Sequence, residues 1–173
     1  MKTATFAGGC FWCTEAIFEN LRGVDSVVSG YAGGHKDNPD YMEVSGGETG
    51  HAEAIQISYN PEEISFKELL YVFLRTHDPT TLNKQGADEG TQYRSVIFYE
   101  NDNQKEVAEE ALSEVQKELS SPVVTELKKL EKFFEAEDYH QDYYKNNSDK
   151  LYCKLVIDPK IQKLKKDFKE YLK

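Results

Sequence analysis

Glycine is crowded into the first part of this chain, and its placement limits where regular strands and helices can run. Nine of the 11 glycines lie among the first 50 residues, and none follows Gly90. Glycine reaches backbone conformations that are closed to other residues and lets other groups approach the main chain, so it marks tight turns. Loops of that kind often carry function. We therefore expect the functional loops in the N-terminal half of the chain.

The hydrophobic pattern between these glycines alternates between strand and helix. Short apolar or alternating runs predict strands at 3–7, 24–32, 52–59 and 93–99. A first helix begins at Cys10 or Phe11 and stops at Gly23. A second helix, with an apolar stripe, follows Pro61. This βαββαβ order is typical of a ferredoxin-like two-layer α+β sandwich.

The remaining residues are predicted to decorate this core, mainly with helices at the C-terminal side. The additions are a charged helix, an edge strand, a short tyrosine-rich helix and a basic amphipathic helix, at about 103–119, 123–127, 138–145 and 154–173. The simplest interpretation of the basic helix is a solvated helix that docks by its apolar stripe. A length of 173 residues fits one domain, so we expect residues 1–173 to form a single unit with 146–173 as its C-terminal segment.

The charge balance argues against two classes of partner. Lysine and arginine number 21 against 31 aspartates and glutamates, so the formal net charge is −10. A surface of that sign repels phosphate backbones and anionic lipids, and we expect no nucleic-acid partner and no membrane partner. No apolar run approaches the roughly 20 residues of a membrane-spanning helix. Because a cysteine motif lies so close to the first residue, we expect no targeting peptide and a cytoplasmic protein with reduced thiols.

The first predicted strand gives way to the first helix at the run Gly8-Gly9-Cys10-Phe11-Trp12-Cys13. Free backbone N–H groups and the positive end of the helix dipole lie at such a point, and both stabilise a thiolate. We therefore expect the pKa of Cys10 to be lowered and Cys10 to act as a nucleophile. The residues alone leave the role of Cys13 open.

Three other interpretations of the cysteines compete with a nucleophile. Cys10 and Cys13 could form a thioredoxin-like redox pair, which would make the chain a general thiol–disulfide oxidoreductase. Together with Cys153 and a histidine they could bind zinc, although the chain has only one C-x-x-C pair. They could also be small buried residues without chemistry. The histidines lack paired metal-ligand spacing, so no histidine metal site is expected.

Glu53 is the most informative acidic residue. In the third predicted strand it shares a face with Ile55, Ile57 and Tyr59, so its carboxyl would be desolvated. Desolvation raises the pKa of a carboxyl, and such a group can act as a general acid near neutral pH. The alternative, with equal support from the pattern, is an edge strand in which Glu53 points to water.

Two tyrosines, Tyr31 and Tyr93, lie at glycine-flanked strand ends. Phenol donors at such places suit the orientation of a substrate oxygen. With 11 tyrosines in the chain, packing is the competing interpretation for each of them.

Together these segments resemble a known family, the methionine sulfoxide reductase A family of peptide-methionine (S)-S-oxide reductases. The matching segments are Gly9-Cys10-Phe11-Trp12, Gly30-Tyr31-Ala32-Gly33-Gly34, Gly50-His51-Ala52-Glu53-Ala54, His77-Asp78-Pro79-Thr80, Gly90-Thr91-Gln92-Tyr93-Arg94-Ser95 and Ala136-Glu137-Asp138-Tyr139-His140-Gln141. They occur in the family's order and span most of the chain, about 6–153. The family's ferredoxin-like fold agrees with the strand and helix order above.

The resemblance implies roles for the residues that match. Cys10 corresponds to the nucleophile, and Glu53 to the acid beside the sulfoxide oxygen. Tyr31 and Tyr93 correspond to the phenols that hydrogen-bond to that oxygen. Residues of the substrate pocket are implied as well, namely Phe11 and Trp12 as the aromatic wall for the S-methyl group, with Asp88 and His140 in support.

The implied reaction reduces methionine sulfoxide, free or in oxidised proteins, without a metal or an organic cofactor. Cys10 becomes a sulfenic acid, a second thiol condenses with it to a disulfide, and thioredoxin reduces the disulfide. Many family members have glycine at the position of Cys13 and a resolving cysteine near the C-terminus. We favour Cys153 as that resolving cysteine, because a flexible segment could reach Cys10 without unwinding a helix, and we keep Cys13 as the alternative.

Overall fold

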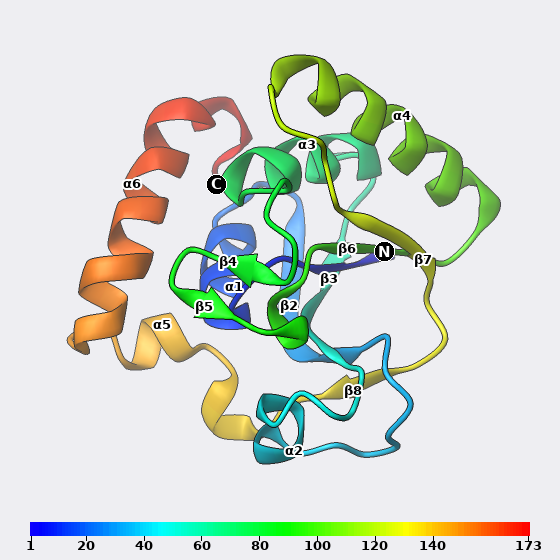
Figure 1. Ribbon diagram of the computed structural model, residues 1–173. Helices are drawn as coiled ribbons and strands as arrows, with labels where there is room; N and C mark the ends of the chain where they lie inside the picture. Colours follow the sequence, from blue (N-terminus) through cyan, green and yellow to red (C-terminus); the bar gives the residue numbers. More distant parts are fainter.

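The computed structural model describes all 173 residues and shows an α+β fold built on one curled six-stranded sheet (Figure 1). The strands of this sheet are β1 (Lys2–Ala7), β2 (Val24–Ala32), β3 (Ala52–Tyr59), β6 (Val96–Tyr99), β7 (Glu126–Lys129) and β8 (Phe133–Glu135). They lie in the order β7-β6-β1-β3-β2-β8. Only the β6–β7 pair is parallel, so the sheet is mixed. A separate hairpin is formed by β4 (Lys84–Gln85) and β5 (Asp88–Glu89).

Helices cover the sheet and extend beyond it at the C-terminal side (Figure 1). They are α1 (Phe11–Glu19), α2 (Tyr41–Ser45), α3 (Phe66–Thr76), α4 (Asp102–Glu118), α5 (Tyr143–Asn146) and α6 (Asp158–Asp167). Short helical turns occupy Thr91–Tyr93, Asp138–His140, Cys153–Ile157 and Lys169–Tyr171. None of the helices combines the length and the apolar character that a membrane crossing requires.

The main hydrophobic core lies between one face of the sheet and helices α1 and α3. Phe6 of β1 is at its centre, with its ring centroid 5.9 Å from that of Phe18 in α1 and 4.7 Å from that of Phe73 in α3. The opposite face of the sheet carries small residues such as Ala7 and Ala54, and chain segments rather than long helices cover it. This division leaves the end of β1 and the start of α1 as the junction between core and surface.

Most of the predicted elements are present, with corrections at their ends and in the loops. The fourth predicted strand begins at Val96 rather than Tyr93, because Thr91–Tyr93 forms a helical turn instead. The predicted edge strand near 123–127 runs parallel to β6 as Glu126–Lys129. The hairpin β4–β5 and the strand β8 were not predicted, since each consists of only two or three residues.

The basic C-terminal helix is shorter than the predicted 154–173, because α6 spans Asp158–Asp167 and separate helical turns lie at both ends, but it docks by an apolar stripe as the sequence predicts. Ile161, Leu164 and Phe168 are buried and belong to the main core. The lysines between them, such as Lys163 and Lys165, are exposed. Helix α6 lies beside α1 (Figure 1), and the residues after it hydrogen-bond to the segment that follows α1, where the N–H of Arg22 donates to the carbonyl of Tyr171.

Candidate active site

Cys10 lies at the turn between β1 and α1, where it is the N-cap residue of the helix. Gly9 before it has a φ of +89°, a conformation that favours glycine, and its N–H donates to the carbonyl of Tyr93 at 3.2 Å. A Cβ at Gly9 would come within 2.7 Å of the Gln85 side chain. Glycine is therefore required here for two reasons, and the turn presents Cys10 with its side chain partly exposed.

Glu53 faces this turn from strand β3. Its Oε1 accepts a 3.1 Å hydrogen bond from the main-chain N–H of Phe11, and the side chain is only 2% exposed. Burial raises the pKa of Glu53 to about 8. The hydrogen bond from Phe11 opposes this rise, and the charge of Asp88 adds to it. Since β3 lies between β1 and β2, the alternative of an edge strand is wrong. Glu53 is a buried carboxyl that stays protonated at neutral pH.

The expectation of a lowered pKa at Cys10 is wrong for the reduced protein. Burial raises the pKa of Cys10 well above its ordinary value, and a hydrogen bond to Cys13 and the charge of Glu53 add to the effect. The lowered pKa belongs to Cys13 instead. The hydrogen bond from Cys10 lowers the pKa of Cys13 to about 6 against the effect of burial, and the Lys160 ammonium adds to the lowering. The hydrogen bond between the thiols thus favours ionisation of Cys13 over that of Cys10.

The two predicted tyrosines both lie near Glu53 but differ in their contacts. Tyr31 is opposite Glu53 in the register of β2 and β3, is fully buried, and donates a 2.9 Å hydrogen bond to Oε1 of Glu137. Tyr93 is half-buried, and burial together with the charge of Glu53 raises the pKa of its phenol. Tyr41 of α2 has a raised pKa from the same two causes. The charge of Glu53 thus contributes to keeping all three phenols protonated.

An aromatic wall stands next to Cys10. Phe11 is fully buried, while the half-buried Trp12 stacks flat on Tyr143, with ring centroids 3.7 Å apart and an angle of 6°. The indole N–H of Trp12 donates a 3.0 Å hydrogen bond to Nδ1 of His140. Burial lowers the pKa of His140, which is therefore neutral and carries its proton on Nε2. This hydrogen bond fixes the orientation of the indole. It supports the role expected for His140 in the substrate pocket.

Tyr152 connects Asp88 to the site by a hydrogen bond, and Cys153 is the next residue in the chain. The hydroxyl of Tyr152 lies 3.3 Å from Oδ2 of Asp88 and 3.5 Å from Sγ of Cys13. Cys153 is fully buried in the helical turn Cys153–Ile157, and burial raises the pKa of its thiol. Cys153 thus lies within a regular helical turn of the segment that we expected to carry it to Cys10.

Four residues of the site were not predicted from the sequence: Tyr41, Glu137, Tyr143 and Tyr152. Glu137 binds both the Tyr31 hydroxyl and the main-chain N–H of Tyr41, each at 2.9 Å. It belongs to one of the segments noted in the sequence, so attention to every polar residue there could have found it. Nothing in the sequence distinguishes Tyr41, Tyr143 and Tyr152 from the other tyrosines of the chain.

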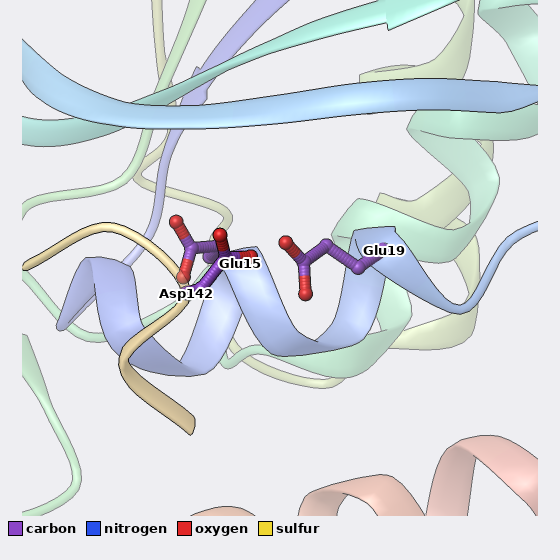
Figure 2. Close-up of side chains that lie close together, drawn as sticks. All are labelled: Glu15, Glu19 and Asp142. Atoms are coloured by element: carbon purple, nitrogen blue, oxygen red, sulfur yellow. The ribbon is translucent and has the colours of Figure 1, made fainter. Parts of the chain in front are cut away.

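A cluster of carboxyls lies behind the aromatic wall, where α1 meets the start of α5. Glu15, Glu19 and Asp142 have carboxylate oxygens within 4.8 Å of one another (Figure 2). Lys145 lies 3.4 Å from Glu19 and 3.5 Å from Asp142, and Glu15 accepts a 3.2 Å hydrogen bond from the main-chain N–H of Tyr143. This cluster joins the segment that carries Tyr143 to the helix that carries Trp12.

The site is that of a thiol-based redox protein, because an N-cap cysteine, a second thiol and a buried acid lie together beside an aromatic wall. The chain belongs to the peptide methionine sulfoxide reductase family, whose model matches residues 2–172. It is 52% identical over 173 residues to the peptide methionine sulfoxide reductase MsrA of Saccharolobus solfataricus, covering 100% of this chain and 98% of that protein.

Solved structures of the same family agree with the fold. Reduced Mxr1 from Saccharomyces cerevisiae matches with a TM-score of 0.81 and 38% identity, over 88% of each chain. Mxr1 in complex with Trx2 matches with a TM-score of 0.58 and 27% identity, over 80% of this chain and 83% of that one.

Proposed function

We propose that this protein reduces methionine (S)-sulfoxide, free and in oxidised proteins, to methionine by thiol chemistry at Cys10, with thioredoxin as the reductant. The observation that carries the proposal is Glu53, a buried carboxyl with a pKa of about 8 that is hydrogen-bonded to the first residue of the Cys10 helix. Family membership and the MsrA relatives support the substrate and its (S) configuration. The Mxr1–Trx2 complex of a relative supports the reductant.

Glu53 makes the sulfoxide reactive. A sulfoxide sulfur is a poor electrophile until its oxygen is protonated or strongly hydrogen-bonded. Glu53 supplies the proton and Tyr93 donates a hydrogen bond, whereas the Tyr31 hydroxyl, expected to share that task, donates to Glu137. Positive character then develops on sulfur, which the faces of Phe11 and Trp12 favour. The wall holds the S-methyl group so that the sulfur faces Cys10.

Cys10 attacks the activated sulfur. Its proton passes to the Cys13 thiolate, to which it is hydrogen-bonded in the reduced protein. The oxygen is then transferred from the substrate sulfur to the sulfur of Cys10. The substrate S–O bond and the new bond between the two sulfurs both break, Cys10 is left as a sulfenic acid, and methionine leaves. A second thiol then displaces the oxygen as water and forms a disulfide with Cys10. The dithiol of thioredoxin reduces that disulfide by exchange and becomes oxidised itself.

A chiral assay tests the function directly. Each epimer of methionine sulfoxide is incubated with the protein, first with dithiothreitol and then with thioredoxin and its reductase. Consumption of the (S) epimer alone, in both systems, is expected, and the Cys10→Ser variant is expected to be inactive with both reductants. Sulfoxide reduction by Cys10→Ser contradicts the proposed nucleophile, and reduction of neither epimer contradicts the function.

A general thiol–disulfide oxidoreductase is the second candidate, favoured by the hydrogen-bonded Cys10–Cys13 pair at a helix start. An insulin-reduction assay separates the two functions, because an oxidoreductase of that kind precipitates insulin in the absence of any sulfoxide. We expect no such activity above that of dithiothreitol alone.

Two further expectations belong to this proposal. The strand order β6-β1-β3-β2 with antiparallel neighbours supports the ferredoxin-like description of the central four strands. We also retain residues 1–173 as one catalytic domain and the cytoplasm as its compartment, in which the thiols of Cys10, Cys13 and Cys153 rest reduced.

A further inference from the structure

Glu15 is a buried carboxyl that the proposed reaction does not use. It lies on α1, three positions after Trp12, and only 1% of its surface is exposed. Its Oε1 accepts a 3.2 Å hydrogen bond from the main-chain N–H of Tyr143, and its Oε2 accepts a 3.0 Å hydrogen bond from the Ser29 hydroxyl. One carboxyl therefore joins three elements: α1, β2 and the start of α5.

The start of α5 relies on Glu15 for an acceptor. The first N–H groups of a helix have no partner within the helix and need one from outside. Asp142, the N-cap residue of α5, makes no capping hydrogen bond with its side chain, and its φ of +53° is a conformation that few residues other than glycine adopt. A helix of only four residues also gains little from its own hydrogen bonds. The hydrogen bond from Glu15 therefore fixes the main chain of Tyr143.

Tyr143 is also the residue that stacks flat on Trp12, with ring centroids 3.7 Å apart and an angle of 6°. Trp12 and Glu15 are three positions apart on α1, so their side chains are neighbours on the surface of that helix. Tyr143 contacts both of them, with its ring on Trp12 and its main chain on Glu15. The two contacts together set the position and the tilt of the phenol ring relative to the indole.

The other charged groups around Glu15 do not replace it. Glu19 and Asp142 each have a carboxylate oxygen within 4.8 Å of one of Glu15 (Figure 2), but neither accepts the N–H of Tyr143. Lys145 lies 3.4 Å from Glu19 and 3.5 Å from Asp142, so its charge balances theirs. Burial raises the pKa of Glu15 to about 7. At pH 6 the group is therefore mainly a neutral acid, which a side-chain amide can imitate.

We propose that Glu15 is a positioning residue for substrate binding, which holds Tyr143 flat on Trp12 and so keeps the wall for the S-methyl group in place, an inference that rests on the proposed function. Both oxygens of Glu15 are bound to protein groups, so it acts through Tyr143 rather than on the substrate. Its loss should weaken binding of the sulfoxide and leave the chemical step at Cys10 unchanged. KM should therefore rise while kcat stays close to the parent value.

Two substitutions of Glu15, compared at pH 6, test the hydrogen bond. Glu15→Leu fills a similar volume without an acceptor, and it should raise KM for methionine (S)-sulfoxide about 2- to 10-fold, the range that corresponds to the loss of one aromatic stack. Glu15→Gln keeps an oxygen for Tyr143 and an N–H group for the Ser29 oxygen, so it should restore the parent KM. The rescue by Gln distinguishes the hydrogen bond from the charge of the carboxyl.

The fluorescence of Trp12 provides a readout that needs no substrate, because Trp12 is the single tryptophan of the chain. In Glu15→Leu the emission should shift to longer wavelength as the indole becomes more hydrated, and in Glu15→Gln it should match that of the parent. Ser29→Ala is the matched control. It removes the other hydrogen bond of the same carboxyl but leaves the N–H of Tyr143 bound, so it should change neither KM nor the emission.

The possible outcomes separate this inference from the proposed function. If the parent protein reduces no sulfoxide, the proposed function fails and this inference falls with it. If the parent is active and Glu15→Leu keeps the parent KM and emission, or if Ser29→Ala reproduces its effects, the function stands and the inference is overturned. Amide hydrogen exchange of the parent protein covers the case in which Glu15→Leu does not fold. The Tyr143 amide should be protected, and exchange at the rate of an unprotected peptide would overturn the inference.

Discussion

The main-chain N–H of Phe11 donates its hydrogen bond to Oε1 of Glu53 and thereby joins the first turn of α1 to the middle of the sheet. The helix has no capping side chain of its own, since Cys10 at the N-cap makes no such hydrogen bond. Glu53 supplies the missing acceptor from another element. Because Oε1 accepts this N–H, the proton of the acid lies on Oε2. One carboxyl group thus accepts a hydrogen bond from the free N-terminal end of the helix and still carries an acidic proton.

Substitution of Glu53 separates these two tasks. Glu53→Gln keeps an oxygen acceptor for Phe11 but loses the acid, so kcat should fall about 10²–10⁴-fold while KM changes little. Glu53→Ala also removes the acceptor and should lower the free energy of unfolding by about 1 kcal/mol more than Glu53→Gln does. Steady-state kinetics with thioredoxin and denaturant unfolding measure both effects. A Gln variant that turns over like the parent protein shows that Glu53 is not the acid.

The pH dependence of the first turnover should reflect the same carboxyl. The pKa of Glu53 is raised to about 8, so the acid form is present below that pH and is lost above it. The rate of methionine release should therefore fall as pH rises through 8. Quenched-flow measurements of single turnovers between pH 5 and pH 10 follow this decrease in rate. Its persistence in Glu53→Gln would assign the decrease to another group.

The two predicted tyrosines should behave differently. Tyr31 is committed to Glu137, so Tyr31→Phe should lower the free energy of unfolding by about 1 kcal/mol through the lost hydrogen bond. Tyr93 is half-buried beside Glu53, so Tyr93→Phe should lower kcat more than Tyr31→Phe does and leave stability close to that of the parent. Equal losses of kcat in the two variants would contradict this division.

The stack of Trp12 on Tyr143 should contribute to substrate affinity by holding the wall in place. Tyr143→Ala removes a stacking contact of about 0.5–1.5 kcal/mol and should raise KM for the sulfoxide more than it lowers kcat. The chain has a single tryptophan, so the fluorescence of Trp12 reports the change directly. Tyr144→Ala is the control, because Tyr144 hydrogen-bonds to Asp158 and does not stack on Trp12. Similar KM increases in both variants would show that the stack does not contribute to substrate affinity.

The carboxyl cluster predicts how stability depends on pH. Burial raises the pKa values of Glu15 and Glu19 to about 7. A carboxyl with a raised pKa stabilises the fold fully below its ordinary pKa of about 4.5, and this stabilisation is lost as pH rises through 7. The free energy of unfolding should therefore fall between pH 5 and pH 8. Glu15→Gln should reduce that fall by on the order of 2 kcal/mol, measured by urea unfolding at each pH, and an unchanged slope would contradict the assignment.

The main elements and the central residues of the site could be predicted because their signals are local. Gly9 and Cys10 stand at a break between a strand and a helix, and Glu53 interrupts an apolar face with period two. These patterns depend on neighbours in the chain. The short strands β4, β5 and β8 have no pattern of their own, because two or three residues cannot show a period.

The charge distribution between the thiols could not be predicted. A helix start lowers the pKa of a cysteine in general, which favoured Cys10. In the structure Cys10 is half-buried and the charge of Glu53 opposes its ionisation, while the charge of Lys160, from the other end of the chain, favours that of Cys13. Tyr143 and Tyr152 were missed for the same reason, since their roles depend on contacts with residues more than a hundred positions earlier.

The hydrogen bond between Trp12 and His140 spans 128 positions of the chain. During synthesis, a chain that has emerged only as far as α4 already contains Cys10 and Glu53, but it lacks His140 and Tyr143. The wall that holds the substrate can assemble only after the segment with His140 and Tyr143 has left the ribosome. The nucleophile is thus translated first and becomes part of a complete pocket last, so a truncated chain carries the thiol without the means to select a sulfoxide.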